Sequence, residues 1–278
     1  GMKHHIPTEM DEEDTDITPD VRLTLYNAGH VIGSAIAHFN IGNGLHNFAY
    51  TGDLKYARTN ILEAGNTHFP RLETLMIEST YGGKENNMAE HEADEYMIKV
   101  IKETFERGGK VLMPVLGSGR AQEVMIICER LMREKLIPEA PIYADGMLWD
   151  ITAIHTAYPE FMNRNMREQI FHQEQNPFLS PFFKQVGSNK ERQKIILDEG
   201  PCLILATSGM LMGGPSVEYL KNLCENRKHS LIFSCYQPPG SLGHKIREGD
   251  KEMVRREGQK TEVFKINMDV GYFFPIKE

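Results

Sequence analysis

Two polar residues, each beside a glycine at the end of a predicted strand, are the first candidates for chemistry. His30 lies in the run Gly-His-Val-Ile-Gly-Ser, directly after an alternating apolar and polar stretch that begins at Val21. Asp53 closes the run Thr-Gly-Asp, after a second such stretch at residues 47–50. Glycine lets the backbone approach an ion closely, so both positions suit metal ligands. The alternative is that both are ordinary turn residues, because two candidates are fewer than the three protein ligands that a catalytic zinc site normally has.

A third candidate is the carboxylate of Glu78, which lies in the run Leu-Met-Ile-Glu-Ser-Thr-Tyr-Gly-Gly at residues 75–83. The apolar residues predict a short strand that delivers Glu78 into a turn of small residues. A carboxylate there can transfer protons or orient a histidine. The alternative is a local role as an N-cap or turn acceptor.

Glycine-containing loops follow three predicted strands in the second half of the chain, and they offer polar groups for binding. A strand, a glycine loop and a helix N-terminus together form a potential phosphate cradle, in which Arg120 would be a bidentate partner. The alternative is that the glycines only make the bends of a parallel sheet. The candidate binding residues are Ser118 and Arg120 in the first loop, Ser208 and Gly209 in the second, Tyr236 in the third, and Lys245 shortly after it.

Strands and helices must alternate to position these loops. Apolar residues recur at helical spacing over residues 88–107 and again after Arg120, and apolar runs predict strands between and after these helices, at residues 110–115, 141–143, 202–206 and 230–235. This alternation predicts a parallel sheet covered on both faces by helices, with ligand loops at the carboxyl ends of the strands. Residues 21–50 instead alternate between apolar and polar side chains, which predicts a β-rich first region.

The composition fits a globular protein of 278 residues, of which 40% are hydrophobic and 25% charged. No apolar segment approaches the roughly 20 residues of a membrane helix, so we expect a cytoplasmic protein. The four cysteines are far apart and form no Cys-x-x-Cys pair, which favours buried thiols over disulfides or a zinc ribbon. The net charge of −8 argues against global attraction of nucleic acid and leaves room for a local basic groove.

The order of the motifs is similar to that of a known family. Gly-His-x-x-Gly-Ser, then Thr-Gly-Asp, then Glu-Ser-Thr-Tyr-Gly resembles the metallo-β-lactamase-fold nucleases that carry a β-CASP domain. The closest likeness is to archaeal homologues of the cleavage and polyadenylation specificity factor endonuclease of mRNA 3′-end processing. It covers about residues 20–270 and includes Phe-Pro-Arg-Leu-Glu-Thr-Leu at 69–75, Asp-Gly-Met at 145–147 and Ala-Thr-Ser-Gly-Met-Leu at 206–211.

This resemblance implies roles for the first three candidates. His30 would correspond to a zinc-ligating histidine, Asp53 to the aspartate that bridges two zinc ions, and Glu78 to the acidic residue of the first β-CASP motif. Two metal ions can activate a water and stabilise the attacking and leaving oxygens of a phosphodiester. In the family, RNA threads between the two domains, so single-stranded RNA or another RNA-processing protein is the implied partner.

Two parts of the family pattern are missing from the chain. The motif His-x-His-x-Asp-His, expected well upstream of His30, is absent, and residues 271–278 replace the expected Ser-Gly-His motif. We therefore expect a form truncated at both ends, with zinc absent or weakly bound and little or no nuclease activity. The alternatives are an RNA- or partner-binding β-CASP module, or one half of a split metallo-ribonuclease completed by another chain.

The expected fold class is α/β, with a partial, β-rich metallo-β-lactamase region of the αββα type and a β-CASP domain with a parallel sheet flanked by helices. A partial sandwich would expose apolar sheet faces, so we also expect a homodimer. The expected segments are a flexible acidic lead-in at 1–20, a partial metallo-β-lactamase domain at 21–85, a β-CASP domain at 86–261, and a return strand with a divergent C-terminus at 262–278.

Overall fold

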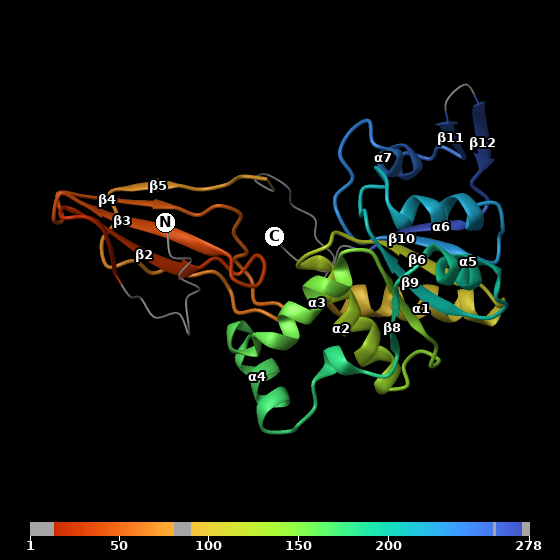
Figure 1. Cartoon of the computed structure of the whole chain (residues 1–278), viewed down its shortest axis with the longest axis horizontal. Helices are drawn as coiled ribbons and strands as arrows, with labels where there is room; N and C mark the ends of the chain where they lie inside the picture. The colour runs from red at the N-terminus through yellow and green to blue at the C-terminus, as the bar shows by residue number, and fades with distance from the viewer. Residues whose placement is uncertain (1–13, 81–89, 258–259, 274–278) are drawn as a thin grey trace. The chain divides into compact units, whose positions relative to one another are not determined.

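The computed structural model of the chain describes residues 14–80, 90–257 and 260–273 (Figure 1). The described residues fall into two compact units. The first unit holds residues 14–80 and 157–175, and the second holds residues 90–156 and 176–273. Within the described residues, the chain therefore returns to the first unit through residues 157–175, which the sequence prediction had placed within the β-CASP domain.

The first unit is built on a five-stranded sheet whose strands follow chain order (Figure 1). Neighbouring strands are antiparallel, except for the last pair, which is parallel. The turn between the third and fourth strands has positive φ angles at Gly42, Asn43 and Gly44, the residue types that tolerate them. The strands are β1 (Thr15–Thr18), β2 (Val21–Asn27), β3 (Ala35–Ile41), β4 (His46–Tyr50) and β5 (Thr74–Met76).

The returning segment of the first unit contains the 3-10 helix η1 (Pro159–Phe161) and the helix α4 (Arg164–Phe171). Asn163 anchors it. Its backbone N–H donates to the carbonyl of Ile61 at 2.7 Å, and its side-chain amide donates to the carbonyl of Thr59 at 2.9 Å. Its side-chain oxygen caps α4. Asn163 is buried, so water competes little for these bonds.

The second unit is built on a six-stranded parallel sheet in the order β13-β10-β6-β9-β7-β8. Successive strands are often not neighbours, because parallel strands need crossover connections. Three of the four predicted strands coincide with observed ones to within two residues at each end, and the fourth, at 202–206, matches fully. The strands are β6 (Lys110–Pro114), β7 (Ile142–Asp145), β8 (Phe183–Val186), β9 (Cys202–Ala206), β10 (Ser230–Phe233) and β13 (Asp269–Tyr272).

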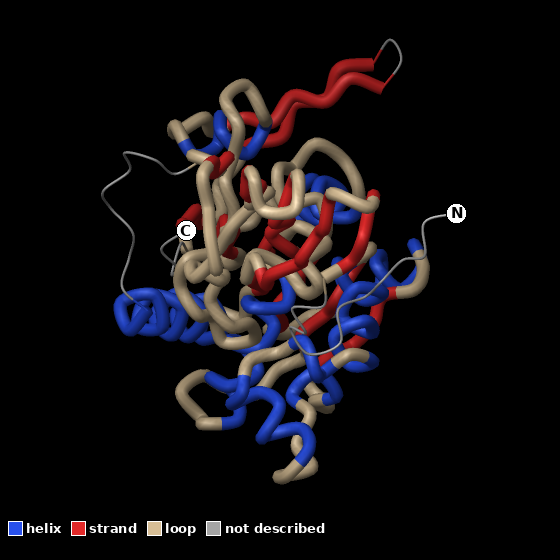
Figure 2. The backbone as a smooth tube through the Cα atoms, turned by 90° about the vertical axis from the view of Figure 1, so that its left-hand side faces the viewer, coloured by secondary structure: helices blue, strands red, loops and turns tan. Residues whose placement is uncertain are grey.

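Helices cover both faces of this sheet (Figures 1 and 2). Val111 and Met113 of β6 pack with α1 and α2, whereas Leu112 between them packs with α5 and α6. This alternation along a strand that is apolar throughout is expected for a sheet buried on both sides. The helices of the second unit are α1 (Glu90–Glu106), α2 (Arg120–Arg133), α3 (Leu148–Ala157, which ends at the first unit), α5 (Asn189–Leu197), α6 (Pro215–Leu223), α7 (Leu242–Arg247) and the short η2 (Pro177–Leu179).

Two glycines shape the end of α1. Gly108 has a positive φ of 71°, as a helix C-terminal glycine does. A Cβ atom on Gly109 would lie 1.7 Å from the carbonyl oxygen of Lys228, so this position has no room for a side chain. The two glycines therefore end the helix and bring the start of β6 against a neighbouring loop.

A two-stranded antiparallel hairpin, β11 (Glu252–Glu257) and β12 (Lys260–Lys265), extends away from the sheet (Figures 1 and 2). Across residues 14–80, 90–257 and 260–273, none of the helices is long and apolar enough to cross a membrane. The expected α/β class, with a parallel sheet flanked by helices, is confirmed.

Candidate functional site

The loop after β2 places His30. Ser34 Oγ accepts the backbone N–H groups of His30 and Val31 at 3.2 and 3.1 Å, which closes the loop. Gly29 has a φ of 69°, and a Cβ atom there would lie 2.6 Å from the backbone nitrogen of Gly65. Only glycine therefore allows this loop to approach the segment around Gly65, and the close packing fixes the position from which His30 projects.

Asp53 lies beside His30. The distance from His30 Nε2 to Asp53 Oδ2 is 3.8 Å, and the two side chains are 39% and 74% exposed. The structure thus brings together two residues that are 23 positions apart in the sequence, at the strand ends where they were predicted to lie. Their role as metal ligands stays a prediction.

Glu78 follows β5 and makes mostly local contacts. Its carboxylate accepts the backbone N–H of Thr80 at 2.7 Å, and its own N–H donates to Thr51 Oγ1 at 3.4 Å. The bond from Thr80, with a smaller contribution from the charge of His30, lowers the pKa of Glu78. The turn-acceptor role that the sequence left open is therefore present, and it holds the carboxylate ionised near His30.

The fit of these residues to zinc can be tested from their spacing. Zinc binds imidazole nitrogen and carboxylate oxygen at about 2.0–2.2 Å with tetrahedral geometry, which puts two ligand atoms about 3.3–3.5 Å apart. The separation between His30 and Asp53 is only slightly larger. However, in the described part of the chain no three His, Cys, Asp or Glu side chains are grouped to hold one ion. Two donors fall short of a zinc centre, so no catalytic step is assigned to a metal.

Three loops meet at the carboxyl end of the second unit's sheet, and Gly209 lies where they meet. A Cβ atom on Gly209, in the loop after β9, would lie 2.6 Å from Cys235 Sγ and 2.9 Å from the backbone nitrogen of Leu116. These two neighbours belong to the loops after β10 and β6. The buried side chain of Gln237 donates to the carbonyl of Gly209 at 2.8 Å. Glycine is needed here for close approach of the backbones.

Arg120 connects two of these loops. It is the first residue of α2, and its Nε donates to the carbonyl of Ser234 at 2.8 Å, while its guanidinium carbon lies 6.0 Å from the ring centre of Phe273. The side chain is only partly exposed. Arg120 therefore positions the loop after β10, a role that the sequence did not indicate.

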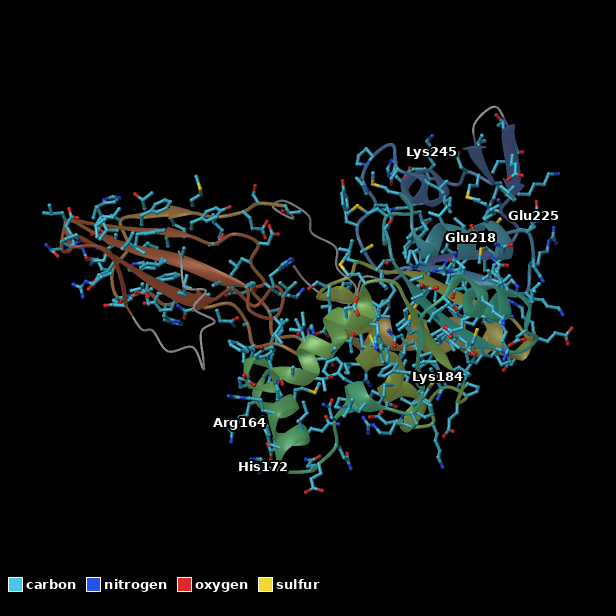
Figure 3. The ribbon with its side chains drawn as sticks, viewed as in Figure 1. Arg164, His172, Lys184, Glu218, Glu225 and Lys245 are labelled. Carbon is cyan, nitrogen blue, oxygen red and sulfur yellow. The ribbon has the colours of Figure 1, made fainter. Side chains whose placement is uncertain are left out.

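The remaining candidates lie in these loops and on α7. Ser118 is partly exposed in the loop after β6, and Ser208 Oγ accepts the N–H of Met212 at 3.1 Å within the loop after β9. Tyr236 is 40% exposed, and Lys245 is exposed on α7 (Figure 3). The loops therefore present a surface with hydroxyl, aromatic and basic groups.

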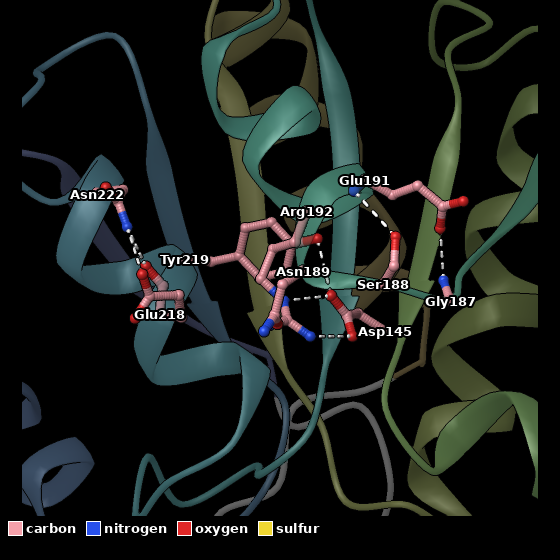
Figure 4. Close-up of polar contacts among 9 residues, drawn as sticks. All are labelled: Asp145, Gly187, Ser188, Asn189, Glu191, Arg192, Glu218, Tyr219 and Asn222. Carbon is pink, nitrogen blue, oxygen red and sulfur yellow. Dashed lines mark hydrogen bonds and ion pairs between the residues drawn. The ribbon is translucent and has the colours of Figure 1, made fainter.

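A buried network behind the loops was missed by sequence reasoning (Figure 4). Asp145, at the end of β7, is 1% exposed and accepts two hydrogen bonds from Arg192, at 2.8 and 3.0 Å. Tyr219 donates a third, at 3.0 Å. Hydrogen bonding to Asp145 raises the pKa of Arg192, and burial raises the pKa of Tyr219. The backbone of Asp145 also accepts the N–H of Thr207, which begins the loop after β9. The network thus supports that loop.

Comparison with known proteins agrees with this architecture. Residues 121–246 match the Beta-Casp domain. The chain is 53% identical over 272 residues to a transcription termination factor FttA of Methanocaldococcus jannaschii, and 54% identical over 272 residues to that of Pyrococcus abyssi. A Lokiarchaeum protein of the same name is 48% identical. Each match covers 97% of this chain but 42% of the relative's length. The chain therefore belongs to the β-CASP family, as its motif order implied.

Proposed function

We propose that the chain is a nucleic-acid-binding β-CASP module of a transcription-termination or RNA 3′-end-processing factor. The observation that carries this proposal is the similarity, over 97% of the chain, to proteins named transcription termination factor. Because the chain spans 42% of their length, the proposal concerns what these residues contribute. A factor of this kind acts where transcripts are made, and we place it in the cytoplasm.

Single-stranded RNA is the proposed ligand of the loop surface. The ring of Tyr236 offers a platform on which a base can stack, and the hydroxyls of Ser118 and Ser208 can bond phosphate or sugar. Lys245, on α7 after the third loop, adds a positive charge. In this proposal, Arg120 contributes chiefly by holding the loop after β10, so its removal would disturb the surface as well as any phosphate contact.

Lys245 therefore gives the cleaner test. We expect Lys245→Ala to weaken the binding of a single-stranded oligouridine and of other single-stranded sequences by the same factor. It should also reduce the slope of log affinity against log salt by about 0.7. Fluorescence anisotropy across a salt series measures both quantities. Lys184→Ala, which removes an exposed lysine on β8, is the matched control (Figure 3). An unchanged slope for Lys245→Ala, or an equal change for Lys184→Ala, would count against this surface.

We also propose that the chain alone has little or no zinc-dependent nuclease activity. The supporting observation is that His30 and Asp53 provide two donors, at 3.8 Å, where a catalytic zinc has three protein ligands. Elemental analysis of the purified chain, together with cleavage of a labelled RNA, tests this. Two tightly bound zinc equivalents per chain, or cleavage that a chelator abolishes, would contradict it.

The alternative is that this chain supplies one half of a metal site, which another chain completes. The proximity of His30 and Asp53 favours this alternative. Two preplaced donors should bind added Zn²⁺ weakly. In this case, a zinc titration followed by calorimetry should show a weak site that is lost in His30→Ala and kept in His172→Ala, which changes an exposed histidine beyond α4 (Figure 3). Equal binding by both variants would remove this alternative.

A further inference from the structure

Two buried glutamines join the loops at the carboxyl end of the second unit's sheet. Gln122, on α2, is 0% exposed, and Gln237, in the loop after β10, is 1% exposed. Their side-chain amides are therefore shielded from water, and their hydrogen bonds are made within the protein. The loops concerned lie at residues 115–119 after β6, 146–147 after β7, 207–214 after β9 and 234–241 after β10.

Gln122 joins the loop after β6 to the loop after β7. Its Nε2 donates to the carbonyl of Gly117, in the loop after β6, at 3.3 Å. The same nitrogen donates at 3.3 Å to the carbonyl of Leu148, the first residue of α3, which directly follows the loop after β7. Thr152 Oγ1 lies 3.2 Å from this nitrogen and itself donates to the carbonyl of Leu148 at 2.7 Å.

Gln237 joins the loop after β10 to the loop after β9. Its Nε2 donates to the carbonyl of Gly209 at 2.8 Å and to the carbonyl of Cys235, in its own loop, at 3.2 Å. Its Oε1 packs against α7, because a Cβ atom on Gly243 would lie 1.7 Å from it. Gln237 therefore also fixes the start of α7, the helix that carries Lys245.

The two connections overlap along the sheet. In the strand order β10-β6-β9-β7, β6 lies between the two strands whose loops Gln237 joins, and β9 lies between the two whose loops Gln122 joins. The backbone hydrogen bonds of a sheet connect only neighbouring strands. The glutamines thus add connections between strands that are not neighbours, and together they tie all four loops into one body.

The amide oxygens of both glutamines suggest a role other than stability. Among the described residues, neither Oε1 has a hydrogen-bond partner. The orientation of each amide is set by its Nε2, because reversal would place oxygen against carbonyl oxygen. A buried carbonyl without a partner costs free energy, and an unbranched apolar side chain of similar length would avoid that cost. Placement of the loops therefore favours glutamine at these positions more than stability does.

We propose, on the basis of the RNA-binding function proposed above, that Gln122 and Gln237 are positioning residues of the loop surface. Both are fully buried, so they act on RNA only through the loops that they hold. These loops carry Ser118, Ser208 and Tyr236. Without either glutamine, its pair of loops can move apart, and the hydroxyls and the aromatic ring no longer match one RNA strand.

The variants Gln122→Met and Gln237→Met test this role in the full chain. We expect each to weaken the binding of a single-stranded oligouridine at least about fivefold, the ratio that corresponds to one net hydrogen bond. The slope of log affinity against log salt should stay that of the parent chain, because no charge is removed. Both variants should unfold at nearly the parent's urea concentration, since loss of the unpartnered carbonyl offsets the lost hydrogen bonds. Gln193→Met, at an exposed position on α5, is the matched control and should bind like the parent.

Amide hydrogen exchange without RNA tests the connections themselves. Gln122→Met should speed exchange in residues 115–119 and 146–148, whereas Gln237→Met should speed it in residues 207–214 and 234–241. Exchange in strands β6 and β9 should stay unchanged in both variants, because the core of the sheet does not depend on the loops.

The outcomes separate this role from the RNA-binding function. If the parent chain binds RNA and both methionine variants bind it equally well, the positioning role is overturned while the RNA-binding function stands. A parent chain that does not bind RNA would overturn the function and the positioning role together. Weaker binding accompanied by faster exchange in β6 and β9 would mean general destabilisation, and would overturn the positioning role alone.

Discussion

At the scale of single residues, the Asp145 carboxylate joins three elements of the second unit. It ends β7 and accepts hydrogen bonds from Arg192 on α5 and from Tyr219 on α6. Replacing it by alanine leaves a guanidinium that is only 16% exposed without its counter-charge. Removing one partner of a buried pair costs about 3 kcal/mol or more. We therefore expect Asp145→Ala to lower the free energy of unfolding by about 3 kcal/mol.

The single tryptophan makes this measurable, because Trp149 packs against the core of the second unit and reports its unfolding in urea. Glu103→Ala is the matched control, since it removes an exposed carboxylate from α1 and should change the free energy of unfolding by less than about 0.5 kcal/mol. A loss for Asp145→Ala as small as that of the control would mean that the network adds nothing to stability.

His229 makes the stability of the second unit depend on pH. Burial, with help from the charge of Lys110, lowers the pKa of His229 to about 4, and its Nδ1 accepts the backbone N–H of Lys110 at 2.9 Å. The unfolded chain binds a proton near pH 6.5, whereas the folded chain does not until about pH 4. As pH falls from about 6.5 to about 4, the folded state therefore loses stability relative to the unfolded state, by on the order of 2 to 3 kcal/mol at about pH 4.

Urea unfolding at pH 7, 6, 5 and 4.5 measures this effect as a difference between variants. The free energy of unfolding should fall less steeply with acid in His229→Gln than in the parent chain, because one proton-binding group has been removed. His172→Gln changes an exposed histidine and should keep the parent slope. Identical slopes in all three proteins would exclude His229 as the source.

At the scale of elements, the loops after β6, β9 and β10 can approach one another closely because Gly209 has no side chain. A methyl group there would lie 2.6 Å from Cys235 Sγ and 2.9 Å from backbone atoms, so the loops would have to separate. We expect Gly209→Ala to cost about 1–3 kcal/mol and to weaken RNA binding beyond that loss. Gly187→Ala, whose new methyl would meet its nearest atom at an ordinary 3.6 Å, should be tolerated in both assays. Equal behaviour of the two variants would show that the loops tolerate separation.

The elements were predictable where the pattern is local. The apolar run at 202–206 coincides with β9, and the glycine pair after residue 107 ends α1. Partners far apart were not predictable, because no spacing links Asp145 to Arg192 or Tyr219. The return of residues 157–175 to the first unit was equally hidden, since the helical pattern of α4 does not reveal where the helix packs. In the candidate site, the proximity of His30 and Asp53 could be expected from the strand ends at which they lie. The hydrogen bond from Arg120 to Ser234 could not be expected from the sequence.

At the scale of the whole molecule, the two units differ in how their sheets are covered. Helices pack on both faces of the six-stranded sheet, whereas one face of the five-stranded sheet carries apolar side chains that are half-buried or exposed. Stability follows the apolar area removed from water, so the first unit should open more readily than the second.

Amide hydrogen exchange followed by mass spectrometry measures this difference between the two units. We expect amides of β2, β3 and β4 to exchange at least about tenfold faster than those of β6, β9 and β10, because local opening of the first unit costs less free energy. Equal exchange in both sheets would show that the chain unfolds as one cooperative body.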